Sequence, residues 1–148
     1  VPVDTNDPGN AGTMIRVADA MGADAVLFAG NTTDPQGPKA VRATAGSLFH
    51  IPVAKDPNIE VALQRLKSKG LTILATAADG DVSLDDAEEL LAQPTAWLFG
   101  NEAHGLSEEL LAQADHRISI PIRGRAESLN LATAASICLF ESARIQNR

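Results

Sequence analysis

The sequence predicts an α/β domain, with a mostly parallel sheet flanked by helices, on three observations. Short apolar runs alternate with helical stretches along all 148 residues, as they do where strands are joined by crossover helices. Runs such as AVLFA at residues 25–29 suit strands that are buried on both faces. The length is that of one domain, and no repeat or linker divides it. We therefore expect residues 1–148 to form a single domain.

The expected elements follow in chain order. Residues 1–3 form the stub of a first strand, and further strands are predicted at residues 25–29, 51–53, 71–76, 95–99 and 116–120. Helices are predicted at residues 12–21, 39–45, 58–69, 87–92, 108–114 and 129–145. Glycines after the first and third helices are stop signals, and Ser107 caps the fifth. Trp97 and the four phenylalanines are expected in the core, as is the single cysteine, Cys138.

Composition excludes several classes of protein. A net charge of −7 argues against a domain that holds nucleic acid by its overall field. One cysteine cannot form an internal disulfide, and no Cys/His pair has zinc-finger spacing. No apolar run reaches the ~20 residues that a membrane span needs. A reducing cytoplasm is the simplest compartment for such a chain.

The last predicted helix carries no charge between residues 128 and 140. A helix that is neutral on every side is normally covered on all faces. A domain of this size covers only one face of a terminal helix, so a second copy in a symmetric dimer is expected to cover the other. A central buried helix is the alternative.

Three polar, glycine-containing segments follow predicted strands, at the sheet edge where α/β proteins bind ligands. They are DPGNAG at residues 7–12 with Arg16 beyond it, LFGNEAHGL at 98–106, and IPIRGRAESLN at 120–130. Each alone has an ordinary explanation as a turn, a solvated acid or a helix cap. None is a dinucleotide-binding or phosphate-loop glycine motif.

Together and in this order, the segments resemble the motifs of the SpoU/TrmH family of RNA 2′-O-ribose methyltransferases, in the SPOUT superfamily. The first family motif is D-P-x-N-x-G followed by Arg, the second is G-x-E-x-x-G-L after apolar residues, and the third is I-P, Gly and S-L-N before a neutral helix. The likeness covers roughly residues 7–141.

The resemblance implies a fold with a C-terminal deep trefoil knot and a homodimer formed through the last helix. It implies S-adenosylmethionine as the cofactor and a ribose 2′-hydroxyl of ribosomal RNA, or of transfer RNA, as the methyl acceptor. No metal is needed, because a sulfonium methyl group is already electrophilic. Family members usually carry an N-terminal RNA-binding domain, which these residues lack, so we expect the missing segment to supply most of the affinity for RNA.

The resemblance also assigns site residues. The catalytic set is Arg16, Asn10, Glu102, Ser128 and Asn130. The cofactor-binding set is Thr76, Ala77, Leu98, Gly100, Asn101, Ile120, Ile122, Ser128 and Leu129. Arg16 is either a base or an electrostatic stabiliser; its permanent positive charge favours phosphate anchoring and stabilisation of the alkoxide.

Two other functions remain open at this point. One is a SPOUT methyltransferase that acts on another RNA atom, which the DPGN and SLN motifs disfavour. The other is a dimeric RNA-binding or assembly factor that keeps the fold without catalysis, which the intact polar set disfavours.

Overall fold

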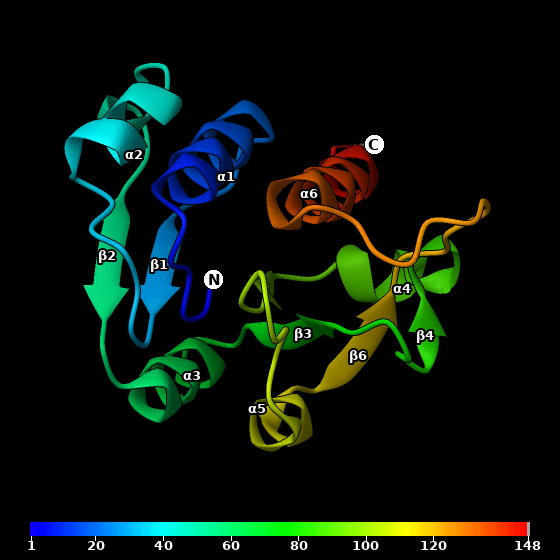
Figure 1. Cartoon of the computed structure of the whole chain (residues 1–148). Helices are drawn as coiled ribbons and strands as arrows, with labels where there is room; N and C mark the ends of the chain where they lie inside the picture. The colour runs from blue at the N-terminus through cyan, green and yellow to red at the C-terminus, as the bar shows by residue number, and fades with distance from the viewer. Residues whose placement is uncertain (148) are drawn as a thin grey trace.

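The computed structural model describes residues 1–147, and it confirms the α/β prediction (Figure 1). The strands are β1 (Val26–Ala29), β2 (Val53–Asp56), β3 (Thr72–Thr76), β4 (Val82–Ser83), β5 (Thr95–Leu98) and β6 (His116–Ser119). The helices are α1 (Pro8–Ala20), α2 (Pro38–Ala43), α3 (Ile59–Ser68), α4 (Glu88–Leu91), α5 (Glu108–Gln113) and α6 (Leu131–Gln146). Short 3₁₀ turns lie at Ser47–Phe49 and Leu84–Asp86.

All strand pairs are parallel, in a two-stranded sheet β1-β2 and a four-stranded sheet β4-β6-β3-β5. Pro2 and Val3 join the two sheets, because Pro2 bridges to Phe99 and Val3 bridges to Ala29. The Val3 N–H donates to the Phe99 carbonyl at 2.8 Å, and the Asp4 N–H donates to the Ala29 carbonyl at 3.0 Å. The predicted first strand is therefore present, and it occupies the middle of one continuous sheet.

This central position creates a switch point in the sheet. From residues 2–3 the chain passes through α1 to β1 and β2 on one side, whereas β5, β3, β6 and β4 lie on the other side. Figure 1 shows α1, α2 and α6 over one face of the sheet, and α3 and α5 over the other. A crevice at the carboxyl ends of the strands is expected where the strand order reverses.

Helix α1 begins four residues earlier than predicted, at Pro8 instead of residue 12. The Asp7 carboxylate caps it, accepting the N–H groups of Gly9 and Asn10 at 2.8 and 3.4 Å. Proline suits the first helical position, because its missing N–H would have no partner there. The DPGN segment is thus the cap and first turn of a helix.

Other differences are local. Strand β2 starts at Val53, where the predicted strand ended, because the ladder with β1 runs from Val53 to Asp56. The short β4 strand and its following turn were not predicted. Gly12 packs α1 against α2: a Cβ atom there would collide with the Ala40 carbonyl and the Ala43 side chain.

The aromatic residues divide into two groups. Trp97, Phe28 and Phe99 are buried as predicted, and the Trp97 and Phe99 rings stack with centroids 6.0 Å apart. Phe49 is 82% exposed and Phe140 is 56% exposed, so the prediction that every phenylalanine lies in the core is wrong.

Helix α6 lies at the surface, so the alternative of a central buried helix is wrong. Ala135, Cys138 and Ser142 are buried on its inner face, where the Trp97 Nε1–H donates to the Ser142 hydroxyl at 2.9 Å. Ile137 and Phe140 are exposed on the outer face. The domain covers one side of the helix and leaves an apolar stripe on the other.

None of the helices within residues 1–147 combines the length and the apolar character that a membrane span requires.

Candidate active site

The three polar segments meet around one pocket of about 390 Å³, which we call the three-segment cleft. Its lining includes most of the expected site residues: Asn10, Thr76, Gly100, Asn101, Glu102, Ser128, Leu129 and Asn130. Segments as distant as α1 and the start of α6 therefore contribute to one cavity at the carboxyl ends of β3 and β5.

Direct contacts join the segments. The Asn130 amide oxygen caps α6 by accepting the N–H groups of Ala132 and Thr133, at 2.9 and 3.2 Å. The nitrogen of the same amide donates to the Asn10 amide oxygen at 3.4 Å. Asn130 is therefore a helix cap and a cleft residue at once.

Glu102 faces the start of α1. Its Oε1 accepts the Asp7 N–H at 3.4 Å, and its side chain is otherwise exposed. A carboxylate at the positive end of a helix is electrostatically favourable. This contact links the second segment to the first.

The second segment is a tight loop closed by a backbone pair between Asn101 and Gly105. The Asn101 amide oxygen accepts the N–H groups of Ala103 and His104, and its nitrogen donates to the Asp4 carbonyl at 2.7 Å. A Cβ atom at Gly100 would collide with the backbone of Gly105. Asn101 therefore shapes the wall of the cleft with its polar atoms already engaged.

Several expected cofactor residues lie outside the cleft lining. Leu98 is fully buried, and its carbonyl accepts the Thr76 hydroxyl at 3.2 Å. The Ala77 N–H donates to the Ile118 carbonyl at 3.0 Å. Ile120 packs against the core.

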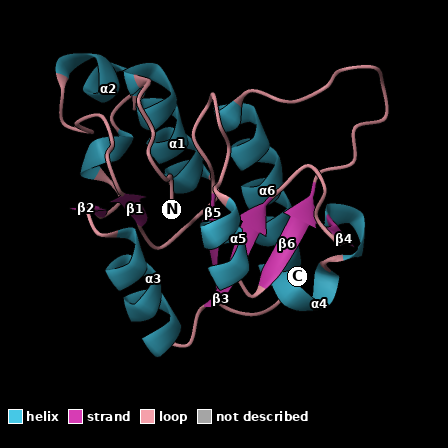
Figure 2. Ribbon diagram, turned by 60° about the horizontal axis from the view of Figure 1, so that its bottom comes forward, coloured by secondary structure: helices cyan, strands magenta, loops and turns pink. Residues whose placement is uncertain are grey.

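Ile122 is 40% exposed, because the segment between β6 and α6 extends away from the body. Figure 2 shows this long excursion. Within the described chain, residues 124–129 make no hydrogen bond. The segment is anchored by Arg123, whose guanidinium lies 2.6 Å from the Asp85 carboxylate.

Arg16 is exposed on α1 and does not line the cleft of its own chain. It follows Asn10 by six residues, which places it roughly 120° away around the helix and roughly 9 Å along it. Arg16 and Glu102 form no ion pair within residues 1–147. The single chain thus brings together the polar cleft residues but not the arginine.

The cleft also contains residues that the sequence reasoning did not assign. Leu106, Leu131 and Ala134 supply apolar surface. Leu106 belongs to the second motif, so the motif could have predicted its place in the cleft. Ala134 lies one turn into α6, and a small neutral side chain carries no signal of its own.

No cluster of three or more His, Cys, Asp or Glu side chains suited to a metal ion occurs within residues 1–147.

Comparison with known proteins extends these findings. The profile of the SpoU rRNA Methylase family matches residues 1–140. The 23S rRNA (uridine(2479)-2′-O)-methyltransferase of Streptomyces viridochromogenes is 39% identical over 142 residues, covering 93% of this chain and 49% of that protein. The 23S rRNA (guanosine(2553)-2′-O)-methyltransferase RlmP of Bacillus subtilis is 39% identical over 134 residues, covering 90% of this chain and 53% of that protein.

Among solved structures, an AdoMet-bound rRNA methyltransferase from Sinorhizobium meliloti superposes with a TM-score of 0.88 at 42% identity. The match covers 97% of this chain and 54% of that chain. The chain spans about half the length of the curated relatives it matches.

Proposed function

The chain belongs to the SpoU rRNA methylase family, and from that premise we propose that it transfers a methyl group from S-adenosylmethionine to a ribose 2′-hydroxyl of ribosomal RNA. We assign this activity to residues 1–148 as one catalytic domain. Ribosomal RNA is preferred over transfer RNA, because the relatives from Streptomyces viridochromogenes and Bacillus subtilis are 23S rRNA methyltransferases.

One observation carries the proposal: the three motif segments line a single cleft, with Asn10 and Asn130 in contact across it. A chain that kept the fold only for assembly would have no need for polar side chains from three segments at one point. This arrangement therefore favours catalysis over the non-catalytic alternative.

The cleft fits S-adenosylmethionine in size and chemistry. Its volume of about 390 Å³ lies within the range of small-molecule sites. Leu106, Leu129 and Leu131 offer apolar contacts, and Thr76 and Ser128 are polar. The cofactor supplies an electrophilic methyl group on a sulfonium. We expect the exposed segment of residues 121–130 to close over it and bring Ile122 into contact.

The polar residues of the cleft have the task of aligning the ribose. A ribose hydroxyl is a weak nucleophile at neutral pH, so alignment with the methyl carbon lowers much of the barrier. Asn10 and Asn130 hold the ribose through amide hydrogen bonds. Glu102 accepts a hydrogen bond from the acceptor nucleotide and orients it.

Arg16 stabilises the developing alkoxide or anchors the neighbouring phosphate, because a guanidinium is a poor base. We place it in the cleft of a second copy, since it is exposed and lies outside the cleft of its own chain. The apolar stripe of Ile137 and Phe140 supports a dimer formed through α6, beside which α1 packs.

The C-terminal segment is also proposed to form a deep trefoil knot, although chains generally avoid knots. The meeting of residues 128–131 with residues 100–106 in one cleft supports this arrangement. In a knotted chain, threading would hold residues 128–131 against the second segment.

The proposal is tested by mapping ribose and base methyl groups in ribosomal and transfer RNA from cells with and without the full-length protein. We expect one ribosomal position to lose its mark. A mark lost from a base atom instead would favour the alternative SPOUT activity. Calorimetric titration with S-adenosylmethionine tests the alternative of an assembly factor without catalysis. Such a protein would be folded but would release no heat of binding.

A further inference from the structure

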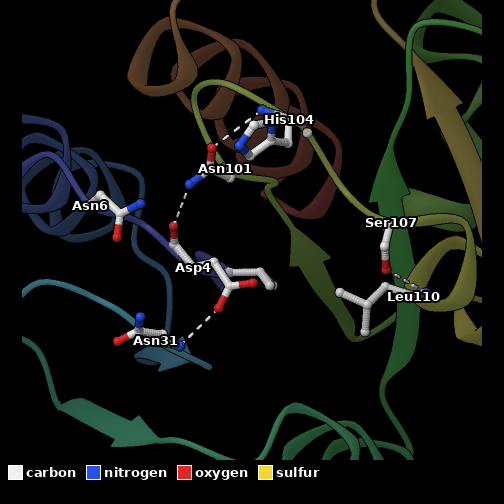
Figure 3. A pocket seen from close by; sticks show the side chains of 9 residues that line it. Asp4, Asn6, Asn31, Asn101, His104, Ser107 and Leu110 are labelled. Atoms are coloured by element: carbon white, nitrogen blue, oxygen red, sulfur yellow. Dashed lines mark hydrogen bonds between the residues drawn. The ribbon is translucent and has the colours of Figure 1, made fainter.

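A second pocket, of about 400 Å³, lies at the switch point of the sheet. It opens at the carboxyl end of the Pro2–Val3 strand, between the ends of β1 and β5. Figure 3 shows Asn6 and Asn31 on one side, Ser107 and Leu110 on the other, and Asp4 between them. We call it the switch-point pocket. It shares Asn101 and Gly105 with the three-segment cleft, so the two cavities are neighbours.

The lining of this pocket combines an apolar floor with polar side chains that have no hydrogen-bond partner within the described residues. Val3 and Leu110 are buried and supply apolar surface. The side-chain amides of Asn6 and Asn31 make no hydrogen bond within residues 1–147, and neither does the His104 ring. No lysine or arginine is among the lining residues, all of which belong to the described chain. Such a lining suits a flat, neutral ligand with donors and acceptors on its edge, and not a phosphate.

Asp4 is held in an unusual conformation at the centre of this pocket. Its φ of 50° lies in the left-handed region, which is uncommon for residues other than glycine. The Asn101 amide donates to its carbonyl at 2.7 Å, and the Asn31 N–H donates to its carboxylate Oδ1 at 2.8 Å. Gly30 leaves space for that carboxylate, which a Cβ atom would occupy. Backbone strain that the surroundings maintain in this way is characteristic of functional sites.

We propose that the switch-point pocket binds the base of the methyl-accepting nucleotide and that Asp4 selects guanine. This inference rests on the proposed function, because it places the ribose of the same nucleotide in the adjoining three-segment cleft. Bases are planar and uncharged, with donors and acceptors along one edge, and asparagine amides pair with such edges.

The carboxylate decides which base fits. A carboxylate only accepts hydrogen bonds, and the second oxygen of Asp4 has no partner within the described residues. Guanine alone presents two adjacent donors, N1–H and the N2 amino group, on its Watson–Crick edge. Its O6 then accepts from the Asn6 amide. Adenine would set its N1 lone pair against the carboxylate.

The test uses the full-length protein, S-adenosylmethionine and RNA fragments that carry the mapped acceptor as guanosine, adenosine, cytidine or uridine. We expect the wild type to methylate the guanosine fragment with a kcat/KM at least about fivefold above the others. Asp4→Asn should lower the rate on guanosine and narrow that preference. Asparagine tolerates the left-handed region, so the loop is retained. Asp24→Asn, at an exposed carboxylate remote from both pockets, is the matched control and should change neither value.

An acceptor without a base provides the second arm. On this RNA, Asp4→Asn and the wild type should react equally, because the proposed contact is gone from both. If Asp4→Asn lowers the melting temperature, Asn6→Ala replaces it, since that exposed side chain makes no hydrogen bond within the described residues.

Equal rates on all four bases, or unchanged selectivity in both variants, would overturn the guanine pocket while leaving methyl transfer standing. A wild type that neither binds S-adenosylmethionine nor methylates any fragment would overturn the pocket together with the function on which it rests.

Discussion

Three buried hydroxyl groups illustrate how single residues stabilise or weaken this fold. Ser142 accepts the Trp97 indole N–H inside the core, whereas the hydroxyls of Thr5 and Thr32 are buried with no partner in the described chain. A buried polar group without a partner keeps its full desolvation cost, and one with a partner offsets it. The same chemical group therefore has opposite effects at Ser142 and at Thr5.

Thr5→Val should raise the free energy of unfolding by about 1 kcal/mol, because valine has the shape of threonine without the hydroxyl. Ser142→Ala should lower it by about 1–3 kcal/mol, because the Trp97 N–H loses its acceptor. Urea denaturation of the two variants measures both values. A destabilised Thr5→Val would mean that its hydroxyl has a partner such as a bound water.

Cys138 should be chemically silent in the folded protein. Burial raises the pKa of its thiol from 9.0 to about 12, so the reactive thiolate is scarce at neutral pH. A thiol reagent at pH 8 should modify it only after denaturation. Because the pKa is higher in the folded state, the stability it contributes is complete below about pH 9 and is lost as pH rises towards 12. Rapid labelling of the native protein would contradict the burial.

At the scale of elements, the outer stripe of α6 is the feature with the clearest consequence. Phe140→Glu should dissociate the proposed dimer without unfolding the chain, because the side chain is exposed. A charge at the neighbouring Leu139 would test folding instead, since that residue packs against the core. Light scattering with a melting curve measures both properties.

Phe49→Glu is the matched control for Phe140→Glu. It adds the same charge at another exposed phenylalanine, on the 3₁₀ turn after α2. We expect it to leave the oligomeric state unchanged. Dissociation by Phe49→Glu, but not by Phe140→Glu, would move the interface away from α6.

The sequence could predict those elements that are specified by residues close together along the chain. Periodicity and apolar runs located all six α-helices of the described chain and every strand except β4, because those signals lie within a few neighbouring residues. The start of α1 was misplaced because Asp7 and Pro8 begin helices as readily as turns. Strand β4 has two residues and no periodicity to detect. The central place of Pro2–Val3 depends on partners at Ala29 and Phe99, which no local pattern contains.

The site divided in the same way. Motif order predicted most of the polar residues that line the three-segment cleft, because their types reflect their chemistry, but it did not predict the apolar Leu106, Leu131 and Ala134. The sequence did not predict that Asp4, Asn6 and Asn31 line one pocket. Their proximity arises from the order of strands in the sheet and not from spacing along the chain. The sequence also leaves open which subunit supplies Arg16 to a cleft, because no pattern along one chain shows how two copies meet.

For the molecule as a whole, the proposed exchange of Arg16 between copies predicts complementation. Arg16→Ala and Glu102→Gln chains should each be inactive alone. Mixed after unfolding and refolding together, they should recover about one quarter of wild-type activity, because half of the dimers are mixed and each mixed dimer holds one intact cleft. The measurement is methyl incorporation by the mixture. No recovery would place Arg16 in the cleft of its own chain.

The central position of the Pro2–Val3 strand in the sheet has a consequence for synthesis of the protein. Residues 2 and 3 leave the ribosome before both of their neighbours, and their bridge to Phe99 closes a loop of about a hundred residues. At synthesis rates of about 5–20 residues per second, several seconds separate the two ends of that pairing. During this time the Pro2–Val3 strand has no partner at Phe99. Slower translation between these residues would lengthen the period in which the nascent chain can misfold.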